Sequence, residues 1–198
     1  GTLTYTPAAQ ANGTATVTVQ IKDDGGVTNG GVDASAPQIF TITVTAVNDG
    51  PSFTLGAGQS VSEDAAPVSV ANWASQISAG PPDEAGQSLT FQLENDNAAL
   101  FSTPPAVSPD GTLNFTPAPN VTGTANVTVT LRDNGGTGSG GTNAFAPQPL
   151  RISITPVNDA PTLAPLNDRT LAEDDAPQTV ALSGITAGPP NETQTLTV

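Results

Sequence analysis

The 198-residue sequence contains no His, Cys or Met, and it has 4 Lys and Arg residues against 18 Asp and Glu. Imidazole bases, thiol nucleophiles, disulfides and ordinary zinc sites are therefore excluded, and we do not expect an enzyme. The net charge is −14 and the basic residues are scattered, which argues against a nucleic-acid partner or an anionic membrane surface. These basic residues are Lys22, Arg132, Arg151 and Arg169. No apolar run approaches the length of a membrane span, so direct membrane insertion is not expected.

The sequence repeats itself with a period of 110 residues, because residues 1–51 align without a gap on residues 111–161 and 27 of these 51 positions are identical. The alignment continues through 62–70 on 172–180 and 78–91 on 186–198. We therefore predict the second half of one repeat at 1–51, a complete repeat at 52–161 and the first part of another at 162–198. The chain starts in the middle of this pattern, which we interpret as an excerpt from a longer protein.

Apolar residues alternate with Thr and other polar residues in several stretches, which is typical of strands with one buried face. The clearest alternation runs through 17–21, 40–44, 89–93, 127–131 and 150–154. No stretch has the period of an amphipathic helix. About seven short strands per 110 residues, separated by some of the 20 Gly and 19 Pro, predict an all-β fold of immunoglobulin-like antiparallel sandwiches. The single Trp73 has Leu182 as its nearest counterpart, so we expect a core residue there. Tyr5 matches Phe115, so we expect its ring in a core as well.

The acidic residues gather in turns and near the two Val-Asn-Asp-X-Pro joints. We expect one group around the first joint: Asp23, Asp24, Asn48, Asp49, Glu63, Asp64, Asp83 and Glu84. A second group is expected around the second joint: Asp133, Asn158, Asp159, Glu173, Asp174, Asp175, Asn191 and Glu192. Adjacent residues of an extended segment point to opposite faces, so one member of the pair Glu63 and Asp64 should be solvated.

Carboxylates that converge without a basic partner repel one another unless a cation neutralises them. Calcium suits such a set, because it takes six to eight oxygen ligands with tolerant geometry, whereas magnesium demands a stricter octahedron. The alternative is that Asp and Asn only stabilise turns through their own backbone. A pair of acids that hydrolyses glycosides is a further alternative, although nothing in the sequence indicates a cleft.

Several motifs in a fixed order carry a family resemblance. They are Ile-Lys-Asp-Asp-Gly-Gly (21–26), Leu-Arg-Asp-Asn-Gly-Gly (131–136), Val-Asn-Asp-Gly-Pro (47–51), Val-Asn-Asp-Ala-Pro (157–161), Ser-Glu-Asp (62–64) and Ala-Glu-Asp (172–174). With these motifs the chain resembles the cadherin-like tandem repeats of large bacterial surface proteins and adhesins. The resemblance implies an extracellular, cell-surface protein with Ca²⁺ bound between repeats.

The resemblance also implies which residues bind the ion. They are Asn48, Asp49, Glu63 and Asp83 or Glu84 at one joint, and Asn158, Asp159, Glu173 and Glu192 at the other. Asp23 and Asp133 match the acidic turn of the family. The acid triplet of the family is replaced by Pro-Ala-Ala-Gln-Ala-Asn-Gly (7–13) and Pro-Ala-Pro-Asn-Val-Thr-Gly (117–123), so we expect one or two ions per joint and not three.

We therefore expect a calcium-stiffened stalk segment of a cell-surface adhesin, whose contacts are with neighbouring repeats of its own chain. One alternative is a self-assembling extracellular fibre, in which identical chains complete each other's partial repeats by strand complementation. A second alternative is a carbohydrate-binding module that uses Trp73 as a stacking platform.

Overall fold

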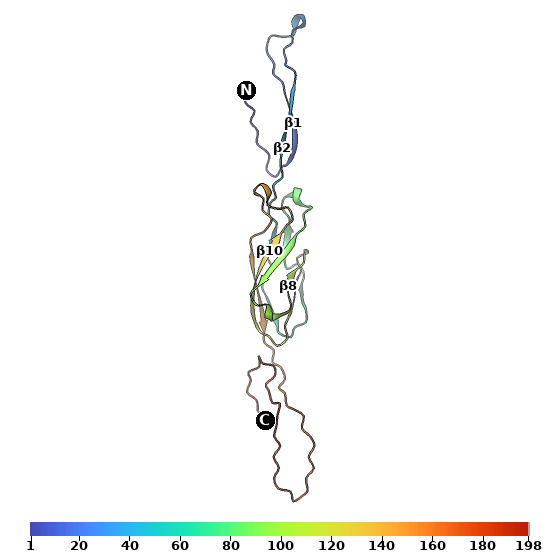
Figure 1. Ribbon diagram of the computed structural model, residues 1–198, viewed down its shortest axis with the longest axis vertical. Coiled ribbons are helices and arrows are strands. Elements are labelled where there is room, and N and C mark those ends of the chain that lie inside the picture. The colour runs from blue at the N-terminus through green and yellow to red at the C-terminus, as the bar shows by residue number, and fades with distance from the viewer. Residues whose placement is uncertain (198) are drawn as a thin grey trace.

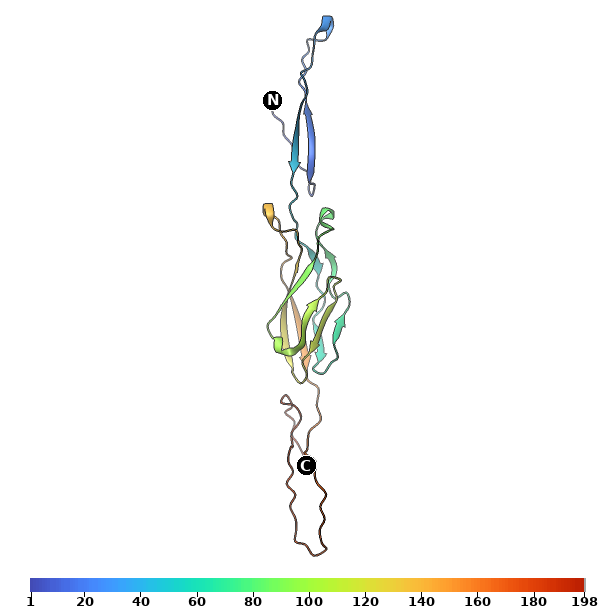
Figure 2. The ribbon, with the colours of Figure 1, turned by 45° about the vertical axis from the view of Figure 1, so that its right-hand side comes forward.

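The computed structural model describes residues 1–197, so Val198, the last residue of the third predicted segment, lies outside the described residues. Figures 1 and 2 show an elongated molecule in which three segments follow one another along the long axis. We name them the N-terminal segment (1–47), the central segment (52–157) and the C-terminal segment (162–197). The first joint is residues 48–51 and the second joint is residues 158–161.

The described residues form strands and short 3₁₀ turns, and none of them is in an α-helix. The strands are β1 (Gly13–Val19), β2 (Gln38–Val44), β3 (Ser52–Thr54), β4 (Gln59–Ser62), β5 (Val68–Val70), β6 (Ser75–Ser78), β7 (Thr90–Asn95), β8 (Phe101–Val107), β9 (Leu113–Pro117), β10 (Gly123–Arg132) and β11 (Gln148–Thr155). The 3₁₀ turns are η1 (Thr28–Gly30), η2 (Pro82–Glu84), η3 (Ala98–Leu100) and η4 (Gly138–Gly140). The prediction of an all-β protein is confirmed. No helix within residues 1–197 is long and apolar enough to cross a membrane.

The central segment contains a four-stranded sheet in the order β4-β11-β10-β7, a three-stranded sheet β5-β9-β8 and the pair β3-β6. All pairs are antiparallel except β4 with β11, which run in the same direction. Side chains from the different sheets share one core, as the edge-to-face contact between Phe53 and Phe91 illustrates with ring centroids 5.2 Å apart. This arrangement is sandwich-like, as the alternating sequence predicts.

Alternate residues of β10 point into this core, because successive side chains of a strand lie on opposite faces. Val127, Val129 and Leu131 are buried, whereas Asn126 and Thr128, on either side of Val127, are exposed. Trp73 also lies in the core, where it is 4% exposed and its indole N–H donates to the carbonyl of Ala57 at 2.8 Å. The prediction that Trp73 is a core residue is confirmed, and a buried indole offers no face on which a sugar can stack.

The N-terminal segment repeats one hairpin of the central segment but not its surroundings. β1 pairs with β2 in the register Gly13 to Val44, and β10 pairs with β11 in the register Gly123 to Ile154, which is the same pairing 110 residues later. No second layer covers β1 and β2 within the described residues. Tyr5, expected in a core because it matches Phe115, is 62% exposed for this reason, and that prediction is wrong.

The C-terminal segment has no strand among its described residues, and Thr162 and Thr186 form its single described β-bridge. Its apolar side chains are largely exposed, as Leu163 and Leu171 illustrate. The central segment is therefore the part of the chain with a closed core.

Leu113 and its counterpart Leu3 test how far this core is confined to the central segment. Leu113 is fully buried and Leu3 is 55% exposed. We expect Leu113→Ala to lower the free energy of unfolding by about 2–5 kcal/mol because it leaves a cavity. We expect Leu3→Ala to change it by less than about 0.5 kcal/mol. Urea unfolding followed by the fluorescence of Trp73, the single Trp of the chain, measures both; equal losses would contradict this assignment of the core.

Candidate functional site

Glu63 lies at the second joint because β4 and β11 run in the same direction. β4 ends at Ser62 and runs parallel to β11, so the residues that follow both strands leave the sheet at the same end. The backbone N–H of Glu63 donates to the carbonyl of Thr155 at 3.0 Å, which continues the pairing by one residue. Glu63 Oε1 in turn accepts from the N–H of Val157 at 2.8 Å. The side chain is 1% exposed, while Asp64 beside it is exposed, as predicted for this pair.

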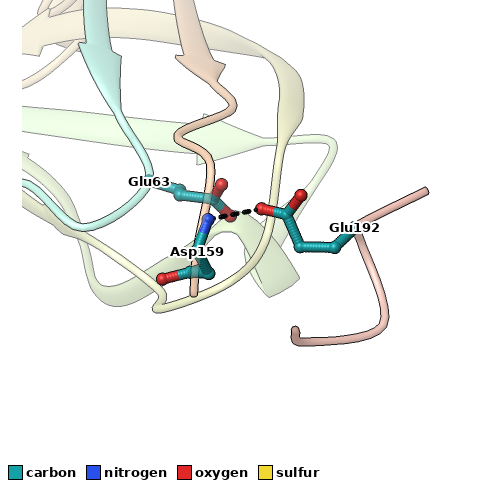
Figure 3. A group of neighbouring side chains, drawn as sticks. All are labelled: Glu63, Asp159 and Glu192. Atoms are coloured by element: carbon teal, nitrogen blue, oxygen red, sulfur yellow. Dashed lines mark hydrogen bonds between the residues drawn. The ribbon is translucent and has the colours of Figure 1, made fainter. Parts of the chain in front are cut away.

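The C-terminal segment brings two further side chains to the same place. Glu192 Oε1 accepts from the N–H of Asp159 at 2.8 Å, and Asn191 Nδ2 donates to Glu63 Oε2 at 2.7 Å. Glu63, Asp159 and Glu192 each offer one carboxylate oxygen, and these three oxygens lie within 4.8 Å of one another. Figure 3 shows Glu63 and Glu192 on either side of Asp159. The cluster therefore joins residues of the central segment, the joint and the C-terminal segment.

The second joint concentrates negative charge around Asp159. Burial raises the pKa of Asp159 above its usual value of 3.8, and the nearby charges of Asp64, Glu192 and Glu63 raise it further. Asp159 Oδ2 is buried and has no hydrogen-bond partner among the described residues. A carboxylate in this situation is stabilised by a bound cation.

The first joint repeats the core of this arrangement. Glu84 Oε1 accepts from the N–H of Asp49 at 2.7 Å, as Glu192 does from Asp159. Gln87 Nε2 donates to Asn48 Oδ1 at 2.7 Å, and the same bond joins Gln194 to Asn158 at 2.9 Å. Glu84 is 6% exposed, and its second oxygen, Oε2, has no partner among the described residues.

Asn48 is held by the loop between β10 and β11. Its Nδ2 donates to Asp133 Oδ1 at 3.0 Å and to the carbonyl of Thr142, and its own carbonyl accepts from the N–H of Thr142 at 2.8 Å. Gly135 and Gly141 make this approach possible, since a Cβ on Gly135 would overlap Asn48 Oδ1 and a Cβ on Gly141 would lie 2.9 Å from the Asn48 carbonyl oxygen. The first joint is therefore packed tightly against the central segment.

Two residues lie at the joint opposite to the one predicted. Glu63 was expected at the first joint and lies at the second, whereas Asp133 was expected at the second and lies at the first. The reason is strand direction: β10 is antiparallel to β11, so Asp133, which follows β10, leaves the sheet at the end where the central segment begins. Asp133 is 7% exposed, and its Oδ2 has no described partner.

The remaining predicted ligands have different surroundings. Asp23 lies after β1, at the end of the N-terminal segment away from the first joint, and its Oδ1 accepts from the N–H of Gly25 at 2.9 Å. This contact is the turn role that was the alternative for these acids. Glu173, the counterpart of Glu63, is exposed in the C-terminal segment and is not part of the described cluster. Asp83 accepts at Oδ2 from Asn12 Nδ2 of the N-terminal segment at 2.8 Å.

Three amide residues that shape the joints were not predicted there: Asn12, Gln87 and Gln194. Asn191 was expected at the second joint, although not as an ion ligand. The recurrence of Gln after the Gly-Pro-Pro motif in both repeats is the one signal that could have identified Gln87 and Gln194.

The donor set of the second joint consists of carboxylate and amide oxygens. It fits a hard cation such as Ca²⁺, which takes carboxylates, backbone carbonyls and water together. The buried, unpartnered Oδ2 of Asp159 agrees with such a ligand. Glu63, Asp159 and Glu192 are the residues that would hold it.

The raised pKa of Asp159 predicts how stability depends on pH without metal. The folded chain holds this proton more tightly than the unfolded chain, so the free energy of unfolding falls as the pH rises from 3.8 through the raised pKa. We expect Asp159→Asn to remove this fall and to raise the midpoint of thermal unfolding in chelator at pH 7. Asp168→Asn, at an exposed position, makes the same change in net charge and serves as the control. Equal midpoints for the two variants would contradict repulsion at Asp159.

The contacts of the two joints are thus the basis for assigning a function. No protein-family model and no curated protein matches the chain.

Proposed function

We propose that the chain is a stalk segment of a bacterial cell-surface adhesin, built from tandem cadherin-like β-sandwich repeats and stiffened by Ca²⁺ at the joints. The observation that carries the proposal is the meeting of Glu63, Asp159 and Glu192 at the second joint. These three acids come from two neighbouring segments and the joint between them, so one ion held by all three would link the segments. The sequence motifs that resemble those of cadherin-like repeats support the same function.

The role of the ion in this proposal is mechanical. Bound Ca²⁺ supplies positive charge to carboxylates that otherwise repel one another, and it restricts the angle between the segments it links. The elongated arrangement in Figure 2 agrees with a part that spans distance. The net charge of −14 agrees with an extracellular surface, where like-charged stalks repel and stay apart.

At the first joint, Asp49, Glu84 and Asp133 are the acids available for a cation, and Asn48 and Asp83 lie beside them. Glu63 has no counterpart within residues 1–47, so the described part of this joint contains fewer carboxylates in contact than the second joint. The second joint is therefore the site at which the proposal is tested.

A calcium titration tests this proposal. Ligand at 100 times its dissociation constant stabilises a protein by about 2.7 kcal/mol per site, so millimolar Ca²⁺ should raise the unfolding midpoint, read from Trp73 fluorescence, by several degrees relative to chelator. Glu63→Gln should abolish most of that rise. Glu173→Gln changes the counterpart residue, which is exposed, and should leave the rise intact. The proposal is wrong if Ca²⁺ produces no rise, or if both variants respond equally.

The exposed apolar side chains of the two outer segments favour a second candidate function, a self-assembling fibre. Val19 and Phe40 on β1 and β2 match Val129 and Leu150, which are buried in the central segment. In the central segment β4 covers one edge of the matching hairpin, and residues 169–172 of the C-terminal segment are the counterpart of β4. The C-terminal segment of a second copy would thus supply a strand at the edge of β2 that corresponds to the edge covered by β4.

Sedimentation velocity separates the two functions. A fibre subunit should grow with concentration over the micromolar range, and Phe40→Lys on β2 should stop this growth because it places a charge on the apolar face. Asp24→Lys places the same charge in an exposed turn and should not stop it. If the chain stays a monomer at every concentration, the fibre function is wrong.

A further inference from the structure

Each joint is crossed by one hydrogen bond between an amide and a carboxylate. At the second joint Asn191 Nδ2, from the C-terminal segment, donates to Glu63 Oε2 of the central segment at 2.7 Å. At the first joint Asn12 Nδ2, from the N-terminal segment, donates to Asp83 Oδ2 of the central segment at 2.8 Å. Neither bond involves the oxygens with which Glu84 and Glu192 hold the joint backbone.

The two bonds have opposite directions and different partner positions, because Asn12 aligns with Thr122 and not with Glu63. At the first joint the amide belongs to the preceding segment and the acid to the following one, whereas at the second joint the acid precedes and the amide follows. Asp83 and Asn191 occupy the same position of the repeated Gly-Pro-Pro-Asp/Asn-Glu motif, at 80–84 and 188–192. One motif position thus carries the acceptor at one joint and the donor at the other.

We propose that the residue at this position, Asp83 or Asn191, is a positioning residue that fixes the orientation of the covalently attached neighbouring segment by pairing an amide with an acid. Glu63 is 1% exposed and both of its oxygens accept hydrogen bonds, one from Val157 and one from Asn191. A carboxylate at position 191 would face the buried Glu63 with a second negative charge and remove the donor. The native pair therefore holds the C-terminal segment in one orientation, and two facing carboxylates would disfavour that orientation.

This inference goes beyond the calcium-stiffened stalk and does not rest on it, because the bond is formed between protein groups alone. It therefore predicts an effect that is present in chelator. The calcium proposal, in contrast, predicts a gain in stability that appears only when the ion is added. The two are separated by running every measurement in both conditions.

The test is a cycle of four chains at the second joint: the native chain, Glu63→Gln, Asn191→Asp and the double variant. In chelator, we expect Asn191→Asp to lower the unfolding midpoint read from Trp73 by several degrees, since two carboxylates then face each other. The double variant should recover most of this loss, because the amide of Gln at position 63 can donate to Asp at position 191. In this new pair the preceding segment donates and the following segment accepts, as Asn12 and Asp83 do at the first joint.

The first joint provides the matched experiment. Asn12→Asp places two carboxylates together, and adding Asp83→Asn restores one donor and one acceptor. The effect should be smaller than at the second joint, because Asn12 and Asp83 are both exposed and Glu63 is buried. At both joints, we expect the double variant, in which donor and acceptor have changed places, to recover the stability that the single variant loses.

A distance measurement reads the joint directly. The chain has no Cys, so a cysteine at each of the exposed positions Ser69 and Thr179 places two spin labels on opposite sides of the second joint. Asn191→Asp should broaden the distribution of distances in chelator, and the double variant should narrow it again. Additive effects in the unfolding cycle, or an unchanged distance distribution in Asn191→Asp, would overturn the proposal even if Ca²⁺ stabilises the native chain.

Discussion

The parallel pairing of β4 with β11 is the constraint on which the second joint depends. It sends Glu63 and Val157 out of the same end of the sheet, and the hydrogen bond between them fixes the Glu63 carboxylate beside the joint. Were β4 antiparallel to β11, Glu63 would leave at the opposite end, and neither Asp159 nor Asn191 would have this partner. The direction of β4, a four-residue strand at the edge of the sheet, thus determines that the C-terminal segment contacts Glu63.

Acidic residues at such a boundary carry an electrostatic cost that the chain offsets in part by hydrogen bonds. Backbone N–H groups and amides donate to Glu63, Glu84 and Glu192, and each of these bonds satisfies one oxygen. The remaining oxygens, among them Oδ2 of Asp159 and Oε2 of Glu84, are buried without a described donor. Hydrogen bonds to the acids are thus fewer than their acceptor sites, and it is this surplus of acceptors that a cation would neutralise.

The sequence is sufficient to predict the strands but only part of the joints. Alternation in 127–131 and 150–154 predicts β10 and β11 because one face of each strand must be buried. A repeat alignment shows which residues recur but contains no information on strand direction, so Glu63 and Asp133 were assigned to the wrong joints. Tyr5 was misassigned for a different reason: its burial in a core requires a second layer of strands, which a pattern within one hairpin does not report.

The amides of the joints were the least predictable residues, because Asn and Gln are common in turns and their partners lie far away in sequence. Asn191 and Glu63 are separated by 128 residues, and Asn12 and Asp83 by 71. Yet these amides are where the two joints of a repetitive chain differ. An acid at position 83 and an amide at position 191 make the two joints different while the backbone contacts of Asp49 and Asp159 stay the same. An exchange of Oδ for Nδ at this one position therefore changes the bond across a joint without altering the fold.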